Sequence, residues 1–67
     1  MSPVDVNLLV NRVRNEFLEM PGLRLTSRQA ARLWGLDASA CDHVIDVLVR
    51  SAFLRWTPAG MVMRLEG

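Results

Sequence analysis

The sequence predicts a small α+β domain with three helices and one antiparallel β-hairpin, in the order helix, strand, helix, helix, strand, strand. Three segments carry apolar residues three and four positions apart, which is the period of an amphipathic helix. Near the C-terminus, two short apolar segments flank a turn, which is typical of a hairpin. Since the chain has only 67 residues, we expect a single domain that spans residues 1–67.

The first helix is expected to run from near the start of the chain to Met20. Pro3 and Asp5 suit a helix start, and Pro21 followed by Gly22 ends the helix, because proline cannot continue it. The inward face is predicted to consist of Val6, Leu9, Val10, Val13, Phe17 and Met20.

A short strand and a second helix are expected next. Leu23-Arg24-Leu25 alternates apolar and polar residues, which suits one short strand with its leucines inward. Thr26 precedes Gln29 by three positions, as in a capping box, and Ser27 is a competing cap. The second helix is predicted to bury Ala30, Leu33 and Trp34 and to place the small Ala31 where it crosses the third helix.

A tight turn at residues 35–37 leads into the third helix. Gly35 suits such a turn because glycine adopts backbone conformations that other residues avoid. Ser39 precedes Asp42 by three positions, so we expect a second capping box and a helix that begins near Ala40. The inner stripe of this helix is predicted to be Cys41, Val44, Ile45, Leu48 and Ala52.

The hairpin is expected at residues 53–57 and 61–65. The turn residues 57–60 lie between the two strands, and so short a connection requires antiparallel pairing. Side chains alternate between the faces of a strand. We therefore expect Leu54 and Trp56 to share one face, and Val62 and Arg64 to lie opposite Met61, Met63 and Leu65.

Composition argues against several classes of function. One cysteine, Cys41, and one histidine, His43, cannot form a disulfide or a zinc site, so no metal or cofactor is expected. Cys41 falls in the apolar phase of its helix and is predicted to be a packing residue. No nucleophile–base pair is visible, so neither an enzyme nor a small-molecule substrate is expected. No leader and no apolar run of about 18 residues is present, so we expect a cytoplasmic protein without membrane contact.

Residues 20–65 resemble the compact winged helix-turn-helix domain of bacteria. The resemblance is carried by Ala31, Gly35, Leu36, Cys41, Val44 and Ile45, followed by Leu48-Val49, Phe53-Leu54 and Gly60. The stretch PGLRLTSRQAARLWGLD is also similar to a recurring type of small bacterial protein. The resemblance implies DNA binding by a transcriptional regulator, although many winged-helix domains serve only as protein contacts.

In that family, the second helix of the helix-turn-helix unit enters the major groove of double-stranded DNA. Mapped onto this sequence, the candidates for reading base edges are Ser39, Asp42, His43 and Asp46. The candidates for contacting phosphates are Arg24, Arg28, Arg32, Arg50, Arg55 and Arg64. Because the net charge is only +1, a monomer would bind weakly, and a homodimer on two half-sites is expected.

The charge of the third helix favours an alternative, a protein–protein interaction module that does not bind DNA. Residues 23–36 carry three arginines and no acid, whereas residues 37–52 carry three aspartates and only Arg50. A carboxylate close to a phosphate is repelled by about 1 kcal/mol or more even in water-like surroundings. Asp42 and Asp46 can instead cap the helix, face solvent or pair with arginines.

Four side chains are candidates for a contact with a second subunit or another protein: Leu8, Trp56, Met61 and Met63. Leu8 falls on the polar side of the first helix, where the simpler interpretation is one exposed leucine. The simpler interpretation of the other three is packing in the core and at the sheet edge.

Overall fold

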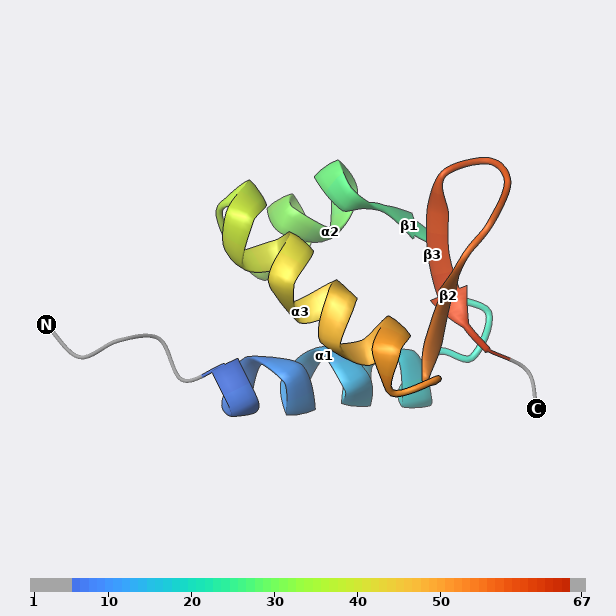
Figure 1. Ribbon diagram of the computed structural model, residues 1–67, viewed down its shortest axis with the longest axis horizontal. Coiled ribbons are helices and arrows are strands. Elements are labelled where there is room, and N and C mark those ends of the chain that lie inside the picture. Colours follow the sequence, from blue (N-terminus) through green and yellow to red (C-terminus); the bar gives the residue numbers. More distant parts are fainter. Residues whose placement is uncertain (1–5, 66–67) are drawn as a thin grey trace, which may run out of the picture.

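The computed structural model describes residues 6–65 (Figure 1). Its elements are α1 (Val6–Glu19), β1 (Leu25–Thr26), α2 (Ser27–Trp34), α3 (Ala38–Arg50), β2 (Leu54–Trp56) and β3 (Met61–Arg64). The predicted α+β class and the predicted order of elements are confirmed. Pro3 and Asp5, which we expected at the start of the first helix, lie outside the described residues.

Figure 1 shows α3 running between α1 and α2, with the sheet at one end of the helices. The sheet has three strands in the order β1-β3-β2, and both pairs are antiparallel. Val62 of β3 lies opposite Leu25 of β1 and Trp56 of β2. The short strand that we expected at residues 23–25 is present, but it begins only at Leu25. Leu23 instead donates its N–H to the Met20 carbonyl at 2.9 Å in the turn after α1.

The core lies where the three helices meet the sheet. Its buried side chains are Val13, Phe17, Ala30, Trp34, Cys41, Val44, Ile45, Leu48, Leu54 and Val62. The Phe17 and Trp34 rings meet edge to face, with centroids 6.2 Å apart, and so join α1 to α2. On the predicted inward face of α1, Val13 and Phe17 are buried, whereas Val6 and Met20 at its two ends are exposed.

The start of α2 is capped as predicted. The Thr26 hydroxyl accepts from the Gln29 N–H at 3.1 Å, and the Gln29 side-chain oxygen accepts from the Thr26 N–H at 3.0 Å. Gly35 ends the helix in the left-handed region, with φ 66°, and the Leu36 N–H donates to the Ala31 carbonyl at 2.9 Å. These contacts set the sharp turn that brings α3 back across α2.

The predicted second capping box is wrong. Asp37, not Ser39, is the N-cap of α3, and its carboxylate accepts from the Ala40 N–H at 2.7 Å. Asp37 has the extended backbone of an N-cap directly after the glycine turn, with φ −73° and ψ 166°. The helix therefore begins at Ala38, two residues before the expected start, and Ser39 falls inside its first turn.

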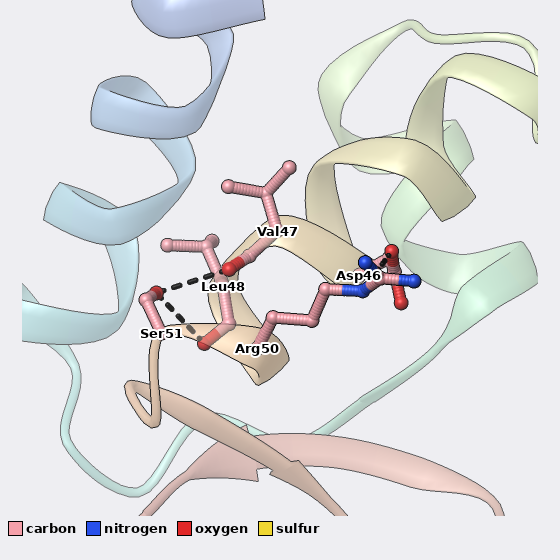
Figure 2. Close-up of polar contacts among 5 residues, drawn as sticks. All are labelled: Asp46, Val47, Leu48, Arg50 and Ser51. Carbon is pink, nitrogen blue, oxygen red and sulfur yellow. Dashed lines mark hydrogen bonds and ion pairs between the residues drawn. The ribbon is translucent and has the colours of Figure 1, made fainter.

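Two residues that we predicted to be buried are exposed. Leu33 is 53% exposed, because on this short helix only Ala30 and Trp34 point into the core. Ala52 lies beyond the end of α3 and has a positive φ of 63°. The Ser51 hydroxyl donates to the Val47 and Leu48 carbonyls at 3.0 and 3.2 Å and helps to close that end (Figure 2).

The hairpin strands are shorter than predicted, at three and four residues. The flanking residues still pair: the Thr57 N–H donates to the Met61 carbonyl at 2.7 Å, and the Leu65 N–H to the Phe53 carbonyl at 2.9 Å. The turn closes through the Gly60 N–H on the Thr57 carbonyl, and Gly60 has a positive φ of 80°. The predicted antiparallel pairing is confirmed.

The position of the α3 cap gives a direct test. Asp37→Ala is expected to lower the free energy of unfolding by about 1 kcal/mol, because the Ala40 N–H loses its acceptor. Ser39→Ala removes a smaller polar group two residues later and is expected to change stability by less than about 0.5 kcal/mol. Thermal and urea unfolding would measure both. An equal loss in the two variants would contradict this assignment of the cap.

Candidate functional site

The outer side of α3 gathers all four base-reading candidates. Ser39, Asp42, His43 and Asp46 are exposed, whereas the residues on the opposite side of the helix are buried in the core. This division follows from the helical period, which separates the apolar stripe from the polar one. The four side chains therefore face solvent along one side of the helix.

One of these residues already has a partner in the chain. The Arg50 Nε lies 2.9 Å from the Asp46 Oδ2, one helical turn away (Figure 2). This agrees with the hypothesis that Asp46 pairs with an arginine. Both side chains are well exposed, so the pair contributes at most about 1 kcal/mol and opens readily. It offsets the charge of Asp46 and leaves Asp42 as the unpaired carboxylate of this face among the described residues.

Two phosphate candidates lie beside the start of α3. Arg28 and Arg32 line a hollow of about 270 Å³ together with Asp42. The other lining residues are Ser27, Ala31 and Ala38. Arg28 and Arg32 stand one turn apart on α2, so both side chains border the same space. The α2–α3 crossing thus brings two cations next to the first turn of α3, at one end of its outer side.

Helix geometry adds to the positive character of this hollow. Ser27 is the first residue of α2 and Ala38 is the first residue of α3, and both line it. Backbone N–H groups at helix N-termini carry partial positive charge and favour anions. The carboxylate of Asp42 opposes this field. Asp37 opposes it too, because its carboxylate already caps the start of α3. The two arginines and the two helix starts therefore face two carboxylates at this place.

Ser39 and His43 also border a second hollow, which was not predicted. It measures about 340 Å³ and lies between the start of α1 and the start of α3. The lining residues are Val6, Leu9, Asp37, Ser39, Ala40, His43 and Val44. No sequence pattern marked this space, because it depends on how far the two helices separate at their N-terminal ends.

The two arginines of the hairpin do not share one face of the sheet. Arg64 pairs with the buried Leu54, and its guanidinium carbon lies 5.8 Å from the centre of the Phe53 ring. Arg55 pairs with Met63 on the other face of the sheet, and its Nη2 lies 3.8 Å from the Met63 sulfur. The two arginines therefore point to opposite faces. Arg24, before β1, is exposed.

Arg14 is a cation that the sequence did not single out. Its guanidinium carbon lies 5.3 Å from the centre of the Phe53 ring, so Arg14 and Arg64 share one aromatic side chain. The contact joins α1 to the segment between α3 and β2. Residues 14, 53 and 64 are far apart in the sequence, and no local spacing predicts that they meet.

The four interface candidates differ in exposure. Leu8 is 67% exposed and Trp56 is 44% exposed, whereas Met61 and Met63 are half-buried. Sequence reasoning missed three further large apolar side chains that are about half exposed, namely Leu18, Met20 and Leu33. The sequence could have indicated the exposure of Leu18, because its spacing from Leu8 places both residues on the outer side of α1.

Cys41 is the packing residue that we predicted. It is fully buried, and its thiol lies 3.7 Å from the Ser27 carbonyl at the α2–α3 crossing. Burial raises the pKa of the Cys41 thiol, and the nearby Asp42 carboxylate raises it further. A thiol held protonated and out of solvent is a poor nucleophile, so Cys41 supports the joint between the helices rather than chemistry.

Between Val6 and Leu65, no three histidine, cysteine, aspartate or glutamate side chains gather closely enough to hold a metal ion. In the same part of the chain, no helix has the length and apolar character needed to cross a membrane. Comparison of the chain with protein-family models, curated proteins and solved structures finds no significant match.

Proposed function

We propose that the chain is a winged helix-turn-helix protein that binds double-stranded DNA through α3 and acts as a homodimeric transcriptional regulator in the bacterial cytoplasm. One observation carries the proposal. The outer side of α3 is polar and exposed along its length, and Arg28 and Arg32 border its first turn. A helix that enters the major groove needs such an uncovered side, and it needs cations beside it for the phosphates.

The proposed contacts divide by chemistry. Arg28 and Arg32 meet the phosphates of one strand, where the starts of α2 and α3 add backbone N–H groups. Ser39 and His43 offer hydrogen bonds to base edges, and Asp42 can accept from a cytosine amino group. Arg50 can leave the exposed pair with Asp46 and turn to a phosphate further along the groove.

Electrostatics predicts modest affinity for one copy. Non-specific binding comes mostly from neutralised phosphates, and few arginines gather on this side of the molecule. Arg64 stacks on Phe53, and Arg55 lies on the other face of the sheet. Two copies that read two half-sites double the number of phosphate contacts, which is why the proposal includes a homodimer.

The proposal is tested by fluorescence anisotropy with a labelled pool of random duplexes. We expect binding at about 50 mM salt. The logarithm of the association constant should fall linearly with the logarithm of the salt concentration, with a slope near −0.9 for each phosphate contact. Random single-stranded DNA at the same concentration is the control, because it shows how much binding comes from charge attraction without a duplex. No binding at low salt by the folded protein would contradict the proposal.

A second candidate function, a protein-interaction module on the same scaffold, is favoured by one feature of the surface. Asp42 and Asp46 lie on the outer side of α3, and large apolar side chains such as Leu33 and Trp56 are exposed elsewhere. Such a module predicts a stable complex with a protein partner, unaffected by added duplex. Immobilised protein that retains a stoichiometric partner at high salt, with no duplex binding, would favour this function over the first.

A further inference from the structure

The outer side of α1 carries a pattern that reads the same in both directions. Leu8, Asn11, Asn15 and Leu18 follow one another at spacings of three, four and three residues. These are the spacings of a coiled-coil seam, and they place the four side chains along one stripe of the helix. All four are exposed, with Leu8 at 67% and Leu18 at 45%. The stripe lies opposite Val13 and Phe17, which are buried in the core of the chain.

We propose that a second copy of the chain docks antiparallel on this stripe, so that α1 pairs with α1 of its partner. The inference names the surface of the proposed homodimer and in that sense rests on the proposed function, but it makes no use of DNA. In this arrangement each Leu8 meets the partner's Leu18, and each Asn11 meets the partner's Asn15. A two-fold axis requires such a self-complementary patch, and the symmetric order leucine, asparagine, asparagine, leucine supplies it.

The polarity of the stripe favours a second copy over an unrelated protein. Asparagine side chains both donate and accept hydrogen bonds, so Asn11 and the partner's Asn15 satisfy each other across the seam. Buried asparagines also specify register in helix pairs, at a cost in affinity.

The size of the surface sets the strength of the pair. α1 has 14 residues, so its axis is about 21 Å long and its outer face about 10 Å wide. An interface of that size belongs to the low end of specific contacts, below about 1,200 Å² in total. We therefore expect a reversible dimer with a dissociation constant in the micromolar range, rather than an obligate one.

The arrangement is tested first by sedimentation equilibrium of the full chain without DNA, over a wide concentration range. Wild type is expected to show a monomer–dimer equilibrium. Leu18→Glu places a charge against the partner's Leu8 and is expected to weaken the dimer by tenfold or more. Leu33→Glu is the matched control: its site is 53% exposed on α2, outside the stripe, and we expect no change. A monomeric wild type, or equal effects of the two variants, would overturn the proposal.

The direction of the pair is tested by disulfide formation. In the antiparallel pair, two copies of position 18 lie roughly 15 Å apart along the axis, which is too far for a disulfide. We expect mixed L8C and L18C chains to cross-link to each other, and each chain alone to remain uncross-linked. Cys41 is buried and does not compete. Cross-linking of each variant with itself would overturn the antiparallel arrangement. A dimer that is lost in Trp56→Ala but kept in Leu18→Glu would overturn it as well.

These readouts separate the dimer from the proposed function. Arg28→Ala/Arg32→Ala chains are expected to dimerise as wild type does, since neither arginine lies on α1. If the dimer forms through α1 and no duplex is bound, the proposed function fails and the inference stands. The opposite result is a chain that binds duplex, stays monomeric without duplex and forms no cross-link between L8C and L18C. In that case the inference fails, and the DNA-binding part of the proposed function stands.

Discussion

Replacing Arg28 and Arg32 together by alanine is expected to weaken duplex binding roughly a hundredfold for each bound copy at about 50 mM salt. Each phosphate contact contributes about 0.9 to the slope of log affinity against log salt. One contact therefore raises the affinity roughly tenfold at about 50 mM salt relative to 1 M salt. Both arginines border the hollow at the start of α3, so the double variant should lose both contacts. We expect the slope to fall by about 1.8 for each copy bound to the duplex, as measured by anisotropy titrations over a salt series.

A second double variant provides the control for net charge. Arg14→Ala/Arg64→Ala removes the same two charges from around Phe53, away from the hollow at the α2–α3 crossing. Its salt slope is expected to stay near that of wild type, although losing the ring contacts can lower stability by about 1 kcal/mol. Circular dichroism confirms that each variant is folded. Equal losses of affinity in the two double variants would indicate bulk charge rather than a defined phosphate site.

Phe17→Ala is expected to leave most of the protein unfolded at 37 °C. Phe17 is fully buried, and its ring meets Trp34 edge to face, so the substitution removes a contact between α1 and α2 and leaves a cavity. Substitutions of this kind cost about 3–5 kcal/mol. A chain of 67 residues has a stability of roughly 3–10 kcal/mol. The loss is therefore comparable to the whole stability of the domain, and urea unfolding at 10–25 °C would measure it.

Leu33→Ala is the control for Phe17→Ala and also tests the fold. The sequence pattern predicted a buried Leu33, whereas the structure leaves it 53% exposed. We expect the substitution to change the free energy of unfolding by less than about 0.5 kcal/mol, with alanine's helix propensity offsetting the lost contacts. A loss of 2 kcal/mol or more, the size expected for a buried leucine, would contradict the orientation of α2.

The candidate site could be predicted in its composition but not in its arrangement. The period of α3 places Ser39, Asp42, His43 and Asp46 on one side, because a helix assigns sides by spacing alone. Whether Arg28 and Arg32 lie beside that side depends on the angle at which α2 crosses α3. The hairpin pattern suggested that Arg55 and Arg64 could contribute too, but alternation along paired strands sends them to opposite faces.

Errors at the ends of elements have a common cause. Asp37 and Ser39 are both good caps, and local pattern could not rank them until the backbone after Gly35 was known. Ala52 continued the apolar period of α3, yet Ser51 ends the helix by bonding back to two carbonyls of its last turn. Competing local hydrogen bonds of similar strength decide such boundaries, so spacing alone predicts them poorly.

The sequence by itself determined the number and order of the helices, the capping box of α2, the glycine turn and the packing role of Cys41. Each depends on residues a few positions apart, whose hydrogen bonds and periodicity are local. Only the tertiary structure decided the exposure of Leu33, the sharing of Phe53 by Arg14 and Arg64, and the hollow at the α2–α3 crossing. These depend on how separate elements pack, and packing is set by the fit of the whole core rather than by any single segment.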